Sequence, residues 1–243
     1  MTPRFYCPLP LESDTVIELP PAPAHHAVRV LRLGAGAAIT LFNGEGGEFS
    51  ATLEPDGSRK VHARIGAPSA VERESPLAVT LVQGIANAER MDYAVQKAVE
   101  LGVAAIVPLA TARSVTRLDA QRAEKRRAHW QQIAIGACEQ CGRNRVPEVR
   151  LPCGIDAWLK QPSTASLRLL LSPLAQESLT AFESPRGDVE LLVGPEGGLS
   201  AEETTAAMRS GFHAVRLGPR TLRTETAGLV ALTAINALWG DLQ

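Results

Sequence analysis

The sequence predicts an α/β protein in which a small β-rich unit precedes a larger parallel sheet with helices on both faces. Up to residue 66 the apolar runs are short, partly alternating and bounded by turn residues. From Leu77 onward, apolar runs alternate with segments of helical periodicity, which is the order of a parallel sheet. Residues 66–76 contain two prolines and three charged residues without periodicity, so we expect a linker there and domains at 1–70 and 71–243.

The first unit is expected to form a small barrel. One amphipathic segment, residues 25–33, stops at Gly34 as a helix does at a C-terminal glycine. The strands and turns around it are predicted at 16–19, 38–42, 43–47 (turn), 48–53, 55–57 (turn) and 61–65. Short strands joined by tight turns are typical of small barrels.

The second unit opens with two strands around a helix. The strands are predicted at 77–82 and 103–107, and Pro108 is expected to end the second strand. Residues 89–101 have helical periodicity, stop at Gly102, and have an apolar face formed by Met91, Ala94, Val95, Ala98 and Val99.

Helices and strands continue to alternate up to the end of the chain. Asp119 is placed to cap a long helix that reaches about Cys141, with an apolar face of Trp130, Ile133, Ala134 and Ala137. Ser200 and Glu203 form a capping-box sequence, which opens a helix that ends before Gly211. The remaining elements are strands at 167–171, 189–193 and 213–217 and a nearly all-apolar helix at 224–239.

Composition excludes several classes of protein. Hydrophobic residues make up 45% of the 243 residues, which excludes global disorder, and no apolar run reaches the ~18 residues of a membrane span. Four cysteines are too few for a disulfide scaffold, and the start lacks a secretion-signal pattern, so we expect a reduced, cytoplasmic protein without membrane contact. Cys138 and Cys141 form a Cys-x-x-Cys pair without a second pair, so no metal is expected.

Basic residues are concentrated in the middle of the chain. Residues 113–150 contain nine Lys or Arg against four Asp or Glu, although the net charge of the whole chain is −1. Such a local excess is a candidate contact surface for a polyanion, and a solvated helix face explains it equally well.

Two glycine-proline loops, Gly194–Ser200 and Gly218–Thr224, each follow a buried strand. Ligands of open α/β sheets bind outside the carboxyl ends of the strands, where glycine lets the backbone approach closely. An ordinary strand-to-helix turn explains either loop alone, but two such loops on consecutive strands favour a binding site. Neither loop has the Gly-x4-Gly-Lys-Ser/Thr pattern, which excludes a P-loop NTPase.

The same two loops carry a resemblance to a known family. Segments 193–200 and 217–227 resemble the signature segments of SPOUT-superfamily RNA methyltransferases. The match is closest to the ribosomal RNA small subunit methyltransferase E family, which methylates N3 of a uridine in 16S ribosomal RNA. Further similar segments are spread in order along the chain, at 26–32, 42–48, 90–102 and 139–143. Cys141 departs from the family pattern, in which a small residue such as serine is expected.

The resemblance implies a fold and partners that periodicity does not reveal. The expected fold is an N-terminal PUA-like β-barrel followed by a SPOUT-type parallel sheet with a deep trefoil knot. The expected partners are 16S rRNA or the small ribosomal subunit and a second copy of the chain, bound through the knotted domain as a homodimer. The expected cofactor is S-adenosylmethionine, held by Leu171, Ser172, Pro173, Val193, Gly194, Pro195, Glu196, Gly197, Gly198, Leu217, Gly218, Leu222, Arg223 and Thr224.

Methylation of uridine N3 requires that the nitrogen lose its proton. A carboxylate can accept that proton, and an arginine can stabilise the negative charge that develops on the base. The candidate bases are Glu196, Glu225 and Glu139, and the candidate cations are Arg220, Arg223 and Arg143. For Glu225 the alternative role is an acidic residue favoured by the positive end of a helix, and for Glu196 it is stabilisation of the loop.

RNA contacts are expected from two groups of basic residues. They are Arg4, His25, His26, Arg29 and Arg32 near the start of the chain and, in the basic stretch, Arg113, Arg117, Arg122, Lys125, Arg126, Arg127, Arg143, Arg145 and Arg150. Aromatic residues are 4% of the chain, which favours recognition of RNA shape over base stacking. Two alternatives remain open: a knotted methyltransferase acting on another RNA base or a ribose 2′-hydroxyl, and a non-catalytic RNA-binding assembly factor.

Overall fold

The chain divides into two compact units. The computed structural model describes residues 2–55, 60–114 and 119–242. The first unit is Met1–Glu74 with Cys138–Val146, and the second is Ser75–Ala137 with Pro147–Gln243. This division differs from the predicted domains because the last residues of the long helix, with the short segment after them, belong to the first unit.

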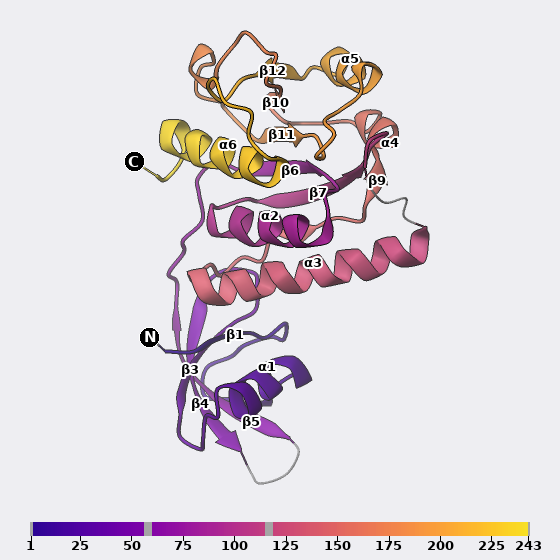
Figure 1. Ribbon diagram of the computed structural model, residues 1–243. Coiled ribbons are helices and arrows are strands. Elements are labelled where there is room, and N and C mark those ends of the chain that lie inside the picture. Colours follow the sequence, from indigo (N-terminus) through magenta and orange to yellow (C-terminus); the bar gives the residue numbers. More distant parts are fainter. Residues whose placement is uncertain (1, 56–59, 115–118, 243) are drawn as a thin grey trace. The chain divides into compact units, whose positions relative to one another are not determined.

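The first unit is built on a five-stranded sheet in the order β1-β3-β4-β5-β2 (Figure 1). Strands β1 and β3 pair in parallel, and the other neighbours are antiparallel. The strands are β1 (Arg4–Tyr6), β2 (Val16–Glu18), β3 (Ala38–Phe42), β4 (Glu48–Pro55) and β5 (Val61–Ser69). Its core includes Phe5, Ile39, Leu41, Leu53 and Ile65, each at most 1% exposed.

Three details of this unit differ from the prediction. The sequence does not predict β1, because three residues are too few to establish a periodicity. Strand β5 continues to Ser69, into the expected linker, because its last residues pair with the start of β4. The helix expected at 25–33 begins earlier, as α1 (Pro21–His25), and continues as a π-helix, η1 (His26–Val30). A proline fits the first turn of a helix, where its missing N–H would have no partner.

The second unit contains a seven-stranded sheet in the order β12-β10-β11-β6-β7-β8, with β9 also paired to β7. All of its pairings are parallel, as predicted. The strands are β6 (Val79–Gly84), β7 (Ala105–Ala110), β8 (Glu148–Val149), β9 (Cys153–Gly154), β10 (Leu167–Leu171), β11 (Val189–Val193) and β12 (His213–Val215). The prediction that Pro108 ends β7 is wrong. The proline lies between the residues that pair with β8 and those that pair with β9, where its missing N–H interrupts neither pairing.

Helices cover both faces of this sheet, as predicted. They are α2 (Ala88–Glu100), α3 (Ala120–Cys141), α4 (Ile155–Leu159), α5 (Ala201–Arg209) and α6 (Thr224–Trp239), with a 3-10 turn, η2 (Leu179–Ala181). Helix α6 packs against α2, β6 and β11 (Figure 1). Trp158 of α4 and Ala207 of α5 pack with Val82 and Leu192, whose side chains point to the face of the sheet opposite to the one that α6 covers.

Candidate functional site

The candidate site lies along one edge of the second sheet. Strands β12, β10, β11 and β6 are consecutive neighbours and all parallel, so their carboxyl ends lie along the same edge. The segments that leave this edge begin at Ser172, Gly194, Arg216 and Ile85. Both glycine-proline loops are among them, as their place after buried strands predicts.

Hydrogen bonds join these segments in pairs. The Ser172 amide donates to the Val215 carbonyl at 3.0 Å, and the Arg216 amide donates to the Glu177 carbonyl at 2.8 Å. The Thr224 hydroxyl donates to the Gly194 carbonyl at 2.5 Å. The loop after β10 is therefore tied to the segment after β12, and the loop after β11 is tied to the start of α6.

Gln83 and Gly84, at the end of β6, complete this edge, and neither was predicted as a site residue. Gln83 is 1% exposed, and its Nε2 donates to the Thr224 hydroxyl at 2.8 Å. A Cβ atom on Gly84 would lie 2.5 Å from the backbone nitrogen of Pro195, so the loop after β11 can approach β6 only because residue 84 is glycine. The glycine at the end of a buried strand was the one available signal.

Two candidate carboxylates, Glu196 and Glu225, contact one arginine. Glu196 Oε1 accepts from the Asn87 backbone amide at 2.9 Å and from Arg90 Nη1 at 3.3 Å. Arg90 Nε lies 3.9 Å from Glu225 Oε1. The other oxygen of Glu225, Oε2, is buried and accepts no hydrogen bond from the residues that the structure describes. Arg90 was not predicted as a site residue.

The candidates Glu139 and Arg143 lie in the first unit. Glu139 accepts the Tyr6 backbone amide at 2.9 Å, and burial raises its pKa. Arg143 is 4% exposed and its Nε donates to Glu74 at 3.1 Å. The Arg143 guanidinium is thus engaged in a buried ion pair, and its role as a cation for RNA or for the developing charge stays a prediction.

Arg220 and Arg223 remain available for a ligand. Both are exposed, and neither forms an ion pair with any residue in the described ranges. The Arg223 backbone carbonyl caps α6 by accepting the amides of Thr226 and Ala227. Both arginines therefore lie in the loop between β12 and α6 with side chains that form no ion pair within the described part of the chain.

Arg113 contacts the loop after β11. Its Nη1 donates to the Gly197 carbonyl at 2.8 Å and approaches the Leu199 carbonyl at 3.4 Å. The nearby Ala112 amide donates to Glu203 Oε1 at 2.7 Å, which further joins this segment to the start of α5. The residue predicted to bind RNA therefore holds the loop.

The other predicted RNA-contact residues are divided between the two units. Arg29 and Arg32 are exposed and His26 is half-buried in the first unit, whereas Arg122, Lys125 and Arg126 lie on α3 in the second. Arg122 pairs with Asp119, Arg127 with Glu124, Arg145 with Glu72 and Arg150 with Glu148. Arg117 lies outside the described residues. Several of these basic residues are thus engaged in ion pairs within the protein.

Arg4 is also occupied by a cluster within the first unit. Its guanidinium pairs with Glu48 and donates to Asn144 Oδ1 at 2.7 Å and to the Gly142 carbonyl at 3.3 Å. The Arg4 side chain is 9% exposed and that of Glu48 is 17% exposed. This guanidinium therefore joins the segment around residues 142–144 to the barrel, and an RNA contact of Arg4 stays a prediction.

Arg4→Met is expected to lower the free energy of unfolding by about 3 kcal/mol at pH 7, because it leaves a mostly buried carboxylate without its main partner. Burial alone would raise the pKa of Glu48, but the Arg4 guanidinium, with Arg73 beside it, holds the pKa below its usual value of 4.5. Because the pKa of Glu48 is lower in the folded than in the unfolded protein, the ionised carboxylate stabilises the fold at pH values above 4.5. This stabilisation is lost as the carboxylate is protonated, so the effect of the mutation shrinks as the pH falls below 4.5.

Urea unfolding at several pH values measures this effect. Arg64→Met is the matched control, since its ion pair with Glu54 is exposed and contributes at most about 1 kcal/mol. Equal losses in the two variants would contradict the buried cluster.

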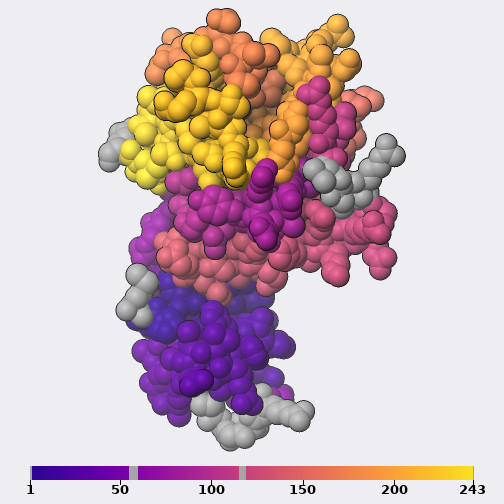
Figure 2. All heavy atoms as spheres, in the orientation of Figure 1, coloured from indigo at the N-terminus to yellow at the C-terminus, as the bar shows by residue number. Residues whose placement is uncertain are grey.

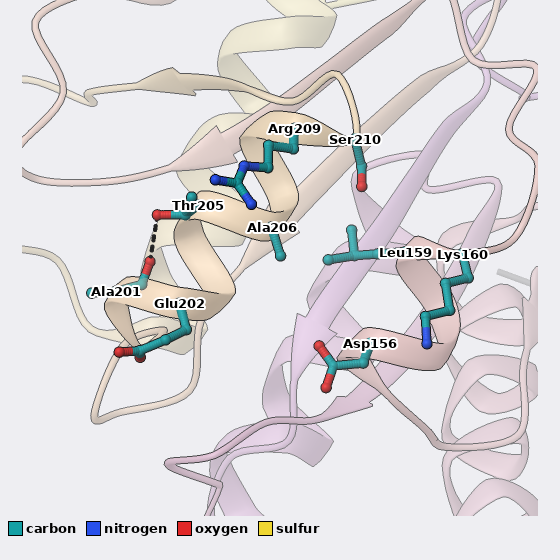
Figure 3. Close-up of a pocket in the computed structure, with 9 residues that line it drawn as sticks. All are labelled: Asp156, Leu159, Lys160, Ala201, Glu202, Thr205, Ala206, Arg209 and Ser210. Atoms are coloured by element: carbon teal, nitrogen blue, oxygen red, sulfur yellow. Dashed lines mark hydrogen bonds between the residues drawn. The ribbon is translucent and has the colours of Figure 1, made fainter.

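A separate groove of about 700 Å³ lies between α4 and α5 (Figure 3). Its lining residues are Asp156, Leu159, Lys160, Ala201, Glu202, Thr205, Ala206, Arg209 and Ser210. No residue predicted to bind a ligand lines it. The described residues include no cluster of three or more metal-ligating side chains. No helix in the described ranges is long and apolar enough to cross a membrane.

Comparisons with known proteins agree along the whole chain. A family model of the RNA methyltransferase domain matches residues 73–236, and a model of the RNA methyltransferase PUA domain matches residues 20–66. Ribosomal RNA small subunit methyltransferase E of Buchnera aphidicola is 34% identical over 99% of this chain and 98% of its own. Two solved structures are each 41% identical to this chain, with complete coverage of both chains. One is described as a methyltransferase of Legionella pneumophila with bound S-adenosylmethionine (TM-score 0.96), and the other is a crystal structure of ribosomal RNA small subunit methyltransferase E of Neisseria gonorrhoeae, also with S-adenosylmethionine (TM-score 0.93).

Proposed function

The chain belongs to the ribosomal RNA small subunit methyltransferase E family of RNA methyltransferases, and from this we propose that it transfers a methyl group from S-adenosylmethionine to N3 of a uridine in 16S ribosomal RNA. The observation that carries the proposal is the sheet edge where the two glycine-proline loops meet, tied together through Thr224 and Gly194. Full-length relatives with the same cofactor bound support it.

The residues at this edge fit such a cofactor. When bound, S-adenosylmethionine supplies an electrophilic methyl group on a positively charged sulfur. It has no phosphate, so it needs apolar walls and backbone groups in place of a phosphate cradle. Leu171, Leu217 and Leu222 are half-buried and Val193 is buried beside the backbone of the glycine loop. Gln83 Oε1 and Glu225 Oε2 are buried acceptors without a donor in the described part of the chain, and donors on a ligand would satisfy them.

Glu225 is the proposed general base. Glu196 Oε1 already accepts two hydrogen bonds, and Glu139 lies in the first unit, bonded to the Tyr6 amide. Only Glu225, among the three candidates in the described chain, has a buried oxygen without a partner. That oxygen can accept the uridine N3 proton, and Arg220 or Arg223 can stabilise the charge that develops on the base.

Arg113→Met is expected to weaken the binding of S-adenosylmethionine about tenfold, because the loop loses the guanidinium that holds its Gly197 and Leu199 carbonyls. Isothermal titration measures the affinity. Arg122→Met removes an exposed arginine that pairs with Asp119, three residues before it, and it should bind the cofactor like wild type. An unchanged affinity in Arg113→Met would show that the loop does not depend on this contact.

RNA contacts are proposed from the basic residues that the structure leaves accessible. These are His26, Arg29 and Arg32 in the first unit and Arg122, Lys125 and Arg126 on α3. Lysine and arginine on phosphates release counterions, so RNA affinity should fall steeply with salt concentration.

We also propose that the chain forms a homodimer, contains a trefoil knot and is located in the cytoplasm. Figure 2 shows α6 at the surface, and Val230 and Leu238 of this helix are 40% and 41% exposed, which favours a second copy as its partner. After the edge strand β12 the chain returns to the middle of the sheet, where α6 packs on β11 and β6 and Thr224 bonds to Gly194. This path of the chain supports the proposed knot. A cytoplasmic location follows from the proposed substrate. Light scattering tests the dimer.

Two measurements test the proposed function. Isothermal titration should show binding of S-adenosylmethionine, and transfer of a tritiated methyl group to small subunits that lack the modification should map to one uridine N3. Absence of cofactor binding would instead support a non-catalytic assembly factor. Label on a ribose or on another base would identify a different target for an enzyme of the same class.

A further inference from the structure

Arg90 breaks a local rule of helix formation. It is the third residue of α2, in the first turn, where the positive end of the helix disfavours a cation and favours an acid. Its side chain is 39% exposed, so burial does not explain its position. Local rules broken in this way are expected where tertiary contacts or function compensate.

Two carboxylates from distant segments provide the compensation. Glu196 lies in the loop after β11, and Glu225 lies in the first turn of α6. Arg90 Nη1 is 3.3 Å from Glu196 Oε1, and Arg90 Nε is 3.9 Å from Glu225 Oε1. Because the guanidinium is a rigid planar fork, one side chain fixes the positions of both carboxylates.

The two carboxylates differ in what remains unsatisfied. Glu196 Oε1 also accepts the Asn87 amide, so this carboxylate is engaged in holding the loop against α2. The Glu225 side chain is 12% exposed, and its Oε2 accepts nothing from the described residues. A buried carboxylate oxygen without a donor is costly, so a donor from outside the chain is expected.

We propose that Arg90 is a positioning residue for methyl transfer, which holds Glu225 Oε1 so that Oε2 is presented to the nitrogen that will be methylated. The inference rests on the proposed function. In the reaction, the N3–H proton passes to Glu225 Oε2 while the nitrogen lone pair forms the bond to the methyl carbon. The electron pair of the methyl–sulfur bond leaves with sulfur, and the protonated Glu225 returns its proton to water.

A double-mutant cycle on the full-length protein tests this role. Single-turnover methylation of unmodified small subunits is measured at saturating S-adenosylmethionine for wild type, Arg90→Met, Glu225→Gln and the double variant, and cofactor affinity is measured separately. Arg90→Met should lower the rate at least tenfold in the wild-type background but less than twofold in Glu225→Gln, because the residue acts through that carboxylate. Cofactor affinity should change by less than threefold.

Arg90→Lys keeps the charge but reaches one carboxylate at a time, so it should recover only part of the rate, and it serves if Arg90→Met fails to fold. Equal rate losses from Arg90→Met in both backgrounds, or a loss of cofactor affinity as large as the loss of rate, would show that Arg90 has only a structural role and would overturn the proposal. A wild-type protein that transfers no methyl group would overturn the proposed function itself, so the two failures are distinguishable.

Discussion

Gly84→Ala should bind S-adenosylmethionine roughly 10- to 100-fold more weakly than wild type, because the methyl group has no space. The added Cβ would lie 2.5 Å from the Pro195 nitrogen and 2.8 Å from the Gly194 carbonyl carbon, and neither backbone atom can move without displacing the loop. Overpacking of this kind costs about 1–3 kcal/mol. If this cost destabilises the loop conformation that binds the cofactor, it corresponds to a roughly 10- to 100-fold loss of affinity. Isothermal titration and thermal unfolding measure the two effects.

Gly136→Ala is the matched control for this substitution. A Cβ on Gly136, within α3, meets nothing within 4 Å, and alanine is the better helix former by about 1 kcal/mol. This variant should keep its cofactor affinity and unfold at the same or a higher temperature. Wild-type affinity in Gly84→Ala would mean that the loop after β11 does not need its close approach to β6.

Glu225→Gln should lower the single-turnover rate roughly 10²- to 10⁴-fold at saturating cofactor, because the amide cannot accept the proton of the target nitrogen. Its stability should be unchanged or higher, since the substitution removes a charge from a mostly buried carboxylate with one unpartnered oxygen. Rapid-quench measurement of methyl transfer, with urea unfolding beside it, checks both parts.

The alternative role of Glu225, as an acidic residue that stabilises the start of α6, predicts the opposite pattern. Its removal would then cost about 0.3–1 kcal/mol of stability and leave the rate intact. Glu202→Gln is the control, because this exposed acid lies at the start of α5. It should keep the wild-type rate.

Most of the fold could be predicted from the sequence because helix and strand signals are local. The strands at 167–171 and 189–193 and the helix at 224–239 have their predicted bounds. Ser200 and Glu203 form the capping box that their spacing predicts. Errors occurred where local signals are weak or mislead, as at Pro108, which stands inside a strand and does not end it.

The candidate site was predicted only in part. Motif and strand order identify the two glycine-proline loops. Gly84 belongs to no motif, and Arg90 begins one of the family-like segments but was assigned no role there. Each matters through a residue more than 100 positions away, Pro195 for Gly84 and Glu196 for Arg90. A chain distance of that size leaves no periodicity or spacing in the sequence from which the contact can be inferred.

The sequence by itself determined the order of most strands and helices, the loops at the carboxyl ends of the strands and the family, because each depends on residues close together in the chain. The tertiary structure decided which charged groups are available for chemistry. Arg4 and Arg143 are buried in ion pairs within the first unit, whereas Arg220 and Arg223 are exposed and Glu225 retains an unpartnered oxygen. Burial and pairing depend on which segments meet on folding, and a one-dimensional pattern of charges does not contain that information.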